Sequence, residues 1–566
     1  MWRSIFILFF LLPEMGARHS PDPSARGGRD AIIDCGAYTR VSEPAKDANG
    51  RFAPVFPGWG HYHYRISTTS DSAQFYFDQG LSLYYSYHLP ESAASFREAA
   101  RRDSGCAMAY WGEALAMGPY YNIAYFYKMP PGVLPVLDEM NALASHASAK
   151  EKDLISALNA RYSTDTTDSR RTLLNGAYSE AMKGLIGRYP DDNDIKALYI
   201  DGKMTEHAWD MWDNEGKPKS WTPELVKYCE EILASNPEHP AALHYQIHLL
   251  EASLHPEATL ASADKLKDLM PGVPHMVHMA SHSYQRTGFY AKGVTINDSA
   301  NAAQRAYSIV APQLGLSTDV IHYDAVQTFC AMNGAMYGKA MQSARKCRDI
   351  TMAHGGVVNT NLQFLSSMPL FVLVRSGKWQ AVLDQPAPDS RWIYSSLLSD
   401  FARGMAYAHL GKEAPAQACL DSLRVLLKDP SLAVRHRPFN AAVKPGTVAE
   451  RILEGELLFI GGKTDAAMTA FQLAIESEDG MDYLEPNEWP LPARQYAGAV
   501  LLRLGRSAEA EKLYQEDLVQ NPGNGWALLG LAQSLEVQHN KDGAEYRKKA
   551  EKAFAEAEVM PTASVY

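Results

Sequence analysis

Residues 496–524 read YAGAVLLRLGRSAEAEKLYQEDLVQNPGN, a stretch in which apolar and small residues recur at intervals of three and four. This spacing predicts two amphipathic helices, and Gly505 marks the turn between them. Gly498 lets the second helix approach the first, Tyr514 fills the space beside it, and Pro522 stops the second helix because proline cannot continue one. The stretch therefore predicts a helical hairpin.

The same pattern recurs along the chain. Ala532 follows Gly498 by 34 residues, and Ala114 follows Gly80 by the same interval. Alternation of apolar and polar residues, the pattern typical of strands, is scarce. We therefore expect an all-α protein, a right-handed α-solenoid of about ten to twelve helical hairpins. Recognisable units cover residues 71–117, roughly 237–303, and 400 to the C-terminal region.

These units resemble the tetratricopeptide repeat (TPR), and a wider resemblance covers nearly all of the chain. Its carriers are FDQGLSLYY (77–85), CAMAYWGEALAMGPYYN (106–122), HYQIHLLEASLHPE (244–257) and NPGNGWALLGLAQSL (521–535). They are similar to a bacterial family of exported TPR proteins with no established activity. The resemblance implies the fold and a concave groove lined by the first helix of each repeat. It implies no reaction.

Two pairs of histidines repeat at the interval of the hairpins. HYQIHLLE begins at His244 and HMASHSYQ at His278, so that His244 and His248 precede His278 and His282 by 34 residues each. Side chains four apart on a helix lie about 5–6 Å from each other, and neighbouring helices pack about 8–10 Å apart. Four imidazoles on one face of two adjacent helices can therefore point at one shared centre.

A metal ion is the ligand that this arrangement predicts. Glu251 lies three residues after His248, and His275 lies three before His278. Imidazole and carboxylate groups suit Zn, Cu or Fe. We expect one transition-metal ion, with Glu251 or His275 completing or tuning its shell. The candidate metal ligands are His244, His248, Glu251, His275, His278 and His282.

Other uses of the same groove stay open. A protein or peptide partner could bind there without a metal, and the second pair could simply be inherited from the duplication of one repeat. The same cluster could also serve a redox or hydrolytic metalloenzyme. Whether the chain is an enzyme or a binding scaffold is therefore undecided by the sequence.

Several function classes have no residues to support them. The chain has no Walker loop, no GxGxxG after a strand, no HExxH and no GxSxG, so no nucleotide cofactor is expected. The net charge is -11, and no basic patch is present. We therefore expect no nucleic-acid partner.

The first residues predict export. Arg3 precedes the apolar run 5–12 and the small residues Gly16 and Ala17, a pattern typical of a secretory signal peptide. The run is too short to span a membrane, and we expect a periplasmic or extracellular protein without a transmembrane segment. The six cysteines show no CxxC pair and predict no disulfide framework. The expected organisation is a signal peptide (1–17), an extended segment (18–70), a TPR-like solenoid with the His-rich groove (71–390) and C-terminal TPR repeats (391–566).

Weaker signals lie outside these units. His61 and His63 sit in an extended loop, where their spacing suits additional ligands. Asp324, next to His322, would follow the histidine column into the next repeat if an insertion is allowed. Chains of the resembled family carry histidines near this position, where this sequence departs from them, so the candidate set takes no ligand from that helix. The segment EPNEW (485–489) predicts an ordered loop before a repeat.

Overall fold

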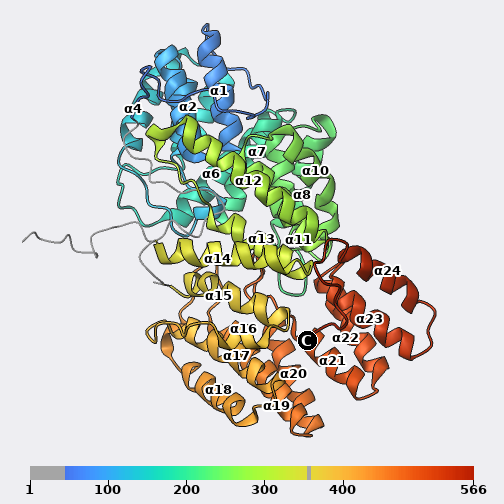
Figure 1. The fold of residues 1–566 in the computed structure, drawn as a ribbon. Coiled ribbons are helices and arrows are strands. Elements are labelled where there is room, and N and C mark those ends of the chain that lie inside the picture. The colour runs from blue at the N-terminus through green and yellow to red at the C-terminus, as the bar shows by residue number, and fades with distance from the viewer. Residues whose placement is uncertain (1–44, 354–358) are drawn as a thin grey trace, which may run out of the picture.

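The structure is a computed structural model that describes residues 45–353 and 359–566 (Figure 1). Within these residues the chain forms twenty-four α-helices and no strand, and one isolated β-bridge joins Trp212 to Pro218. The predicted all-α solenoid of TPR-like hairpins is thus confirmed. The predicted signal peptide lies outside the described residues.

The first ten helices form the N-terminal part of the array, shown in blue and green in Figure 1. They are α1 (Asp71–Tyr84), α2 (Leu89–Arg102), α3 (Ala107–Ala116), α4 (Val133–Leu143), α5 (Ala149–Asn159), α6 (Arg171–Arg188), α7 (Asn193–Glu206), α8 (Thr222–Ser235), α9 (Pro240–Leu250) and α10 (Leu260–Leu269). Residues 45–70 precede α1 without a helix.

Fourteen further helices complete the array. They are α11 (Pro274–Arg286), α12 (Tyr290–Val310), α13 (Ile321–Asn333), α14 (Tyr337–Ala353), α15 (Thr360–Arg375), α16 (Trp379–Leu383), α17 (Ile393–His409), α18 (Glu413–Leu426), α19 (Val443–Ile460), α20 (Thr464–Asp479), α21 (Ala493–Arg503), α22 (Ser507–Gln520), α23 (Gly525–Val537) and α24 (Gly543–Ala553). Among the described residues, no helix combines the length and apolar character needed to cross a membrane.

Small residues set how closely the helices of a hairpin approach. A Cβ atom added to Gly498 of α21 would lie 2.6 Å from the Tyr514 ring of α22, too close for any side chain. Gly455 stands in the same relation to Phe471, at 2.7 Å. Gly505, at the turn, has a φ of +72°, which glycine adopts without strain. The packing predicted for residues 496–524 is therefore present.

The apolar core extends along the array instead of gathering at one point. One buried cluster runs from Ile66 to Leu249, and another from Tyr290 to Val565. This is typical of repeat proteins, in which each unit packs mainly on its neighbours. The five described cysteines, Cys106, Cys229, Cys330, Cys347 and Cys419, form no disulfide.

The end of the array returns to its middle. Arg286 at the end of α11 donates to the carbonyl of Gln520 at 2.8 Å, and Trp526 of α23 donates to the carbonyl of Asn333 at 3.0 Å. Figure 1 accordingly shows the red C-terminal helices beside α11 and α13. This closure brings the loop between α20 and α21 to the inner side of α9 and α11.

Candidate metal centre

Six histidines from three helices lie together in the interior. Proline occupies the first turn of both α9 and α11, as Pro240 and Pro274, where its fixed φ suits the start of a helix. Side chains three or four apart on these helices share a face, so that each helix directs its imidazoles to the same side. None of the six side chains is more than 8% exposed. They are His244 and His248 on α9, His275, His278 and His282 on α11, and His322 on α13.

The ring nitrogens form two groups, in each of which the candidate ligand atoms lie within 4.8 Å of one another. The first triad is His244, His248 and His275, and the second triad is His278, His282 and His322. The Nε2 atoms of His244 and His275 are 3.1 Å apart. The Nε2 atom of His282 lies 2.9 Å from that of His278 and 3.4 Å from that of His322. Together with Glu251 and Glu485, these residues are called the histidine centre below.

Oxygen acceptors behind two of the rings decide where their protons lie. His244 Nδ1 is 2.6 Å from the carbonyl oxygen of Tyr85. His278 Nδ1 is 2.6 Å from Asn297 Oδ1, and the Asn297 amide nitrogen donates to the carbonyl of Gly293. Because both oxygens can only accept, both Nδ1 atoms carry the proton. A neutral imidazole has one N–H group, so each Nε2 directs a lone pair into the centre.

Glu251 fixes one histidine of each triad in the same way. Its Oε1 accepts from His248 Nδ1 at 2.9 Å, and its Oε2 accepts from His282 Nδ1 at 2.8 Å. Burial works to raise the pKa of Glu251, but the adjacent His248 and His282 outweigh burial and lower the pKa to about 2. The carboxylate is therefore ionised and acts only as an acceptor. The Nε2 atoms of both rings are then also lone pairs, and that of His248 has no hydrogen-bond partner among the described residues.

The buried rings resist protonation. Burial is the largest cause that lowers the pKa of four of them well below the ordinary value, and repulsion from neighbouring imidazoles acts in the same direction. These four are His244, His275, His278 and His322. They are consequently neutral near pH 7, the form in which imidazole coordinates metals.

His322 belongs to the centre although the predicted ligand set omits it. It follows His282 by 40 residues, because the long helix α12 and the short turn Pro312–Leu314 extend this repeat beyond 34 residues. Asp324, one side chain further, is bound elsewhere through an ion pair with Lys346 at 3.0 Å. Only an alignment that allows an insertion signals His322 in the sequence.

Glu485, in the loop before α21, is the second residue outside the predicted set. Its Oε1 lies 3.1 Å from His282 Nδ1, and beyond this contact neither carboxylate oxygen has a hydrogen-bond partner among the described residues. Burial and the nearby charge of Glu251 raise the pKa of Glu485. Its candidate ligand atom also groups with those of His248 and Glu251. No spacing in the sequence relates this loop to α9.

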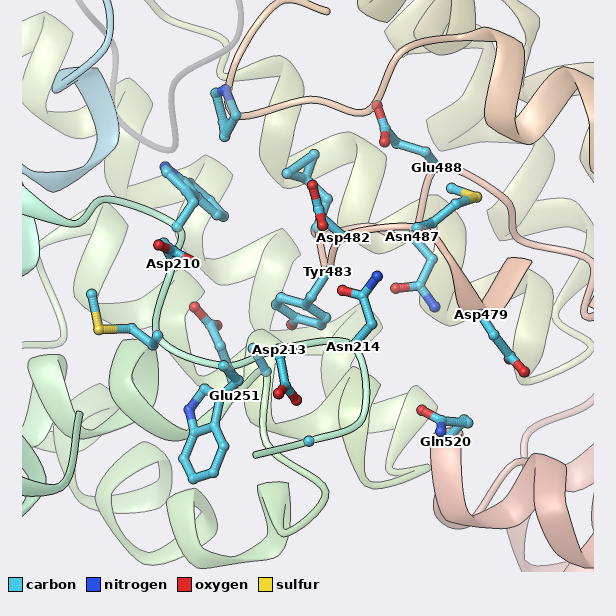
Figure 2. A pocket seen from close by; sticks show the side chains of 18 of the residues that line it. Asp210, Asp213, Asn214, Glu251, Asp479, Asp482, Tyr483, Asn487, Glu488 and Gln520 are labelled. Atoms are coloured by element: carbon cyan, nitrogen blue, oxygen red, sulfur yellow. The ribbon is translucent and has the colours of Figure 1, made fainter. Parts of the chain in front are cut away.

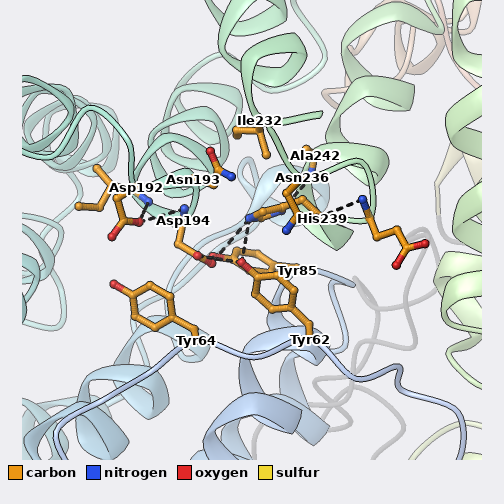
Figure 3. A network of polar contacts seen from close by, with 12 residues as sticks. Tyr62, Tyr64, Tyr85, Asp192, Asn193, Asp194, Ile232, Asn236, His239 and Ala242 are labelled. Carbon is orange, nitrogen blue, oxygen red and sulfur yellow. Dashed lines mark hydrogen bonds and ion pairs between the residues drawn. The ribbon is translucent and has the colours of Figure 1, made fainter. Parts of the chain in front are cut away.

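A seventh buried histidine near the start of α9 has a different environment (Figure 3). His239 Nδ1 accepts from the Ala242 amide at 3.4 Å, and its Nε2 lies 3.0 Å from the hydroxyl of Tyr62. The hydroxyls of Tyr62 and Tyr85 in turn donate to Asp194 at 2.8 and 2.7 Å. These four residues are called the His239 network. Neither nitrogen of His239 is directed at the centre.

The HYHY loop supplies no ligand to the centre. His61 is exposed, and the side chain of His63 is 57% exposed and forms an ion pair with Asp78 at 2.8 Å. Tyr62 and Tyr64 between and after them are partly buried against the N-terminal core. This loop therefore packs through its tyrosines.

A polar chamber of about 630 Å³ adjoins the centre (Figure 2). His248 and Glu251 form part of its wall, next to Tyr121 and Trp209, whose rings stack 5.2 Å apart. The loop that includes Asp213 and the segment around Glu488 line other sides, as Figure 2 shows for a set of labelled carboxylates and amides. The chamber gives small polar molecules a space next to one edge of the centre.

Comparisons with known proteins identify no family for this chain. No protein-family model matches it, and no curated protein does. A solved structure of the human IFIT1 dimer with m7Gppp-AAAA aligns at 13% identity over 83% of this chain and 95% of that chain, with a TM-score of 0.35.

Two further helical-repeat structures align in the same range. The APC/C hetero-tetramer Cut9-Hcn1 matches at 11% identity over 87% of this chain and 78% of that chain, with a TM-score of 0.26. The TPR domain of P58(IPK) matches at 15% identity over 60% and 93% of the two chains, with a TM-score of 0.17. Likeness of this degree carries no argument about function, which must come from the site itself.

Proposed function

We propose that this protein binds transition-metal ions in the histidine centre, with the TPR-like helices as the scaffold. The observation that carries the proposal is the pair His278 and His282, whose Nε2 atoms are 2.9 Å apart while their Nδ1 protons are both directed at oxygen acceptors. Two lone pairs at this distance repel unless a proton or a cation lies between them. Burial lowers the pKa of His278 and so opposes a proton. A metal cation relieves the repulsion without protonating either ring.

The distances support coordination. Two ligand nitrogens bonded at about 2.0–2.1 Å to one ion lie about 2.9 Å apart at a right angle and about 3.3 Å apart at the tetrahedral angle. The Nε2 separations in the centre are 2.9, 3.1 and 3.4 Å. Oxygen acceptors behind the rings are the usual outer partners of metal-bound histidine.

The donor set indicates the class of metal. Imidazole nitrogen suits Zn, Cu, Fe and Ni, whereas Mg and Ca prefer oxygen ligands. The centre offers six imidazoles and two carboxylates. The rings are also buried, so they present little surface to a peptide. These observations favour a metal over a peptide that contacts the histidines.

Thermal unfolding tests the proposal. Protein purified without a histidine tag, stripped with chelator and then mixed with Zn²⁺ or Cu²⁺ should gain stability, by about 4 kcal/mol when the ion is at a thousandfold excess over its dissociation constant. Mg²⁺ serves as the control ion and should give no shift. Protein that retains no metal after purification and shows no shift with either transition ion would contradict the proposal, and a metal-free peptide groove would then be favoured.

A second candidate function is a metal-dependent enzyme that acts on a small polar substrate. The observation that favours it is the chamber, which reaches the centre at His248 and Glu251. An ion with an open coordination position at this edge would face the chamber. Azide added to Co²⁺-loaded protein should change the visible absorption if such a position exists. An unchanged spectrum would favour a closed, structural centre.

Export is part of the proposed function. The charged and apolar pattern of the first residues supports it, with Arg3 followed by the run 5–12. Mature protein recovered from its host should begin near Arg18, as N-terminal sequencing would show. Soluble protein that keeps Met1 would contradict export.

A further inference from the structure

We infer that the histidine centre holds two metal ions side by side, one in the first triad and one in the second. The inference rests on the proposed function and specifies its stoichiometry. It differs from the single ion that the repeat spacing predicts.

The number and grouping of the imidazoles support two ions. A single tetrahedral ion takes four ligands, whereas the centre contains six histidines. Their nitrogens form two sets of three, each within 4.8 Å. The sets abut, because the ring centroids of His248 and His282 are 6.0 Å apart and those of His275 and His278 are 6.1 Å apart. Each set has the size of a three-coordinate site, and the two sites are neighbours.

The carboxylates connect the two triads. Glu251 accepts from His248 of the first triad with one oxygen and from His282 of the second triad with the other. One rigid carboxylate therefore orients a ring in each site. Glu485 contacts the same pair of residues from the opposite half of the chain, near His282 Nδ1 and grouped with His248.

The charge balance favours copper in its monovalent state. The neutral imidazoles contribute no charge, and Glu251 and Glu485 contribute two negative charges when both are ionised. Two Cu⁺ ions carry two positive charges and so neutralise the buried centre, whereas two divalent ions leave an excess of two positive charges. A buried uncompensated charge is unfavourable. Cu⁺ is therefore the probe of choice.

The two ions differ in access. His248, of the first triad, is the one imidazole among the described residues that line the chamber. No member of the second triad does so. A chelator that enters through the chamber should therefore remove the ion of the first triad before that of the second.

Native mass spectrometry of protein loaded anaerobically with Cu⁺ tests the inference. Wild type should hold two copper ions, the variants His275→Gln and His322→Gln should hold one each, and the double variant should hold none. His239→Gln changes a buried histidine outside the centre and should keep two. Circular dichroism on every variant should show that the helices are retained.

The outcomes separate this inference from the proposed function. One copper ion in the wild type overturns the two-ion inference but leaves metal binding intact, and none overturns both. Loss of both ions from each folded single variant also overturns it, because the triads would then form one joint site. X-ray absorption on the two-copper protein gives a second measurement: about three nitrogen ligands per copper are expected, and four per copper would contradict the assignment.

Discussion

Two buried polar clusters lie along α9, and they use histidine in opposite ways. In the His239 network both ring nitrogens of His239 have partners, the Ala242 amide on one side and the Tyr62 hydroxyl on the other. In the histidine centre, oxygen acceptors hold the Nδ1 protons of His244 and His248, and the Nε2 atoms face inward. Burial alone therefore does not distinguish a ligand from a structural histidine. The direction of the lone pair does.

The carboxylates show the same contrast. Burial raises the pKa of Asp194 to about 7, although the hydroxyls of Tyr85 and Tyr62 donate to it and oppose the increase. The pKa of Glu251 moves the other way, because its histidine neighbours outweigh burial. The His239 network is thus close to neutral, whereas the histidine centre retains an ionised carboxylate that can offset the charge of a cation.

The largest expected effect is the loss of metal binding in a double variant. His248→Gln together with His282→Gln removes one nitrogen ligand from each triad, while the amides keep similar volume and polarity. Because replacing mere outer partners of a site already costs 10- to 100-fold in affinity, we expect binding of Zn²⁺ or Cu²⁺ to fall by more than about a hundredfold. Isothermal titration calorimetry measures it. His239→Gln is the matched control, and an equal loss there would remove the distinction between the clusters.

Acid should destabilise the metal-free protein through the histidine centre. The pKa values of His244, His275 and His278 are lowered in the folded state, so below about pH 6.5 the unfolded chain takes up protons that the folded chain excludes. Their contribution to stability is present above that pH and is lost as the pH falls. Each ring can contribute up to about 1.4 kcal/mol per pH unit.

Urea unfolding of chelator-treated protein between pH 7.5 and 5 would measure this dependence. His275→Gln should flatten the curve because one of the contributing imidazoles is absent. A free energy of unfolding that does not change over this range would show that the rings are already protonated in the folded protein, and would remove the lone-pair argument.

A smaller effect is expected when the carboxylate behind the rings is altered. Glu251→Gln keeps one carbonyl oxygen and cannot accept from His248 and His282 at once. Outer partners of this kind are worth about 10- to 100-fold in metal affinity, so we expect a reduction in that range with stoichiometry unchanged. Competition with a fluorescent zinc chelator would measure it. Wild-type affinity in the variant would mean that Glu251 does not orient the rings.

The smallest effect should come from the His239 network. Tyr62→Phe removes the hydroxyl that joins His239 to Asp194, at a cost of about 1–3 kcal/mol for the buried groups left without a partner. Metal affinity should not change, because the network supplies no group to the centre. Parallel measurements of urea unfolding and of Zn²⁺ binding check both halves of this expectation. A change in affinity would show that the two clusters are coupled through α9.

Most of the scaffold could be predicted from the sequence because its determinants are local. The recurrence of small and aromatic residues, as at Gly498 and Tyr514, follows from the contact between two helices adjacent in the chain. The interval of 34 residues likewise placed His244 and His278 at equivalent positions. The structure brings both into the histidine centre, together with every other residue of the predicted ligand set.

The repeat period failed where a repeat changes length. The extended α12 shifts His322 out of the interval, although α13 still packs beside α11 and presents that ring to His282 at 3.4 Å. A constant spacing cannot report a residue that arrives through a longer connection. The division of the ligands into two triads was hidden for the same reason.

By itself the sequence determined the helical hairpins and the histidine-bearing faces of α9 and α11, because helix periodicity and neighbour packing depend on residues close in the chain. The tertiary structure alone decided that Glu485 reaches Glu251 and His282, and that a polar chamber opens beside His248. Both follow from the return of the C-terminal repeats onto α11 and α13, where Arg286 contacts Gln520 and Trp526 contacts Asn333. The curvature that closes the array is the sum of small rotations at many interfaces, which no single motif encodes.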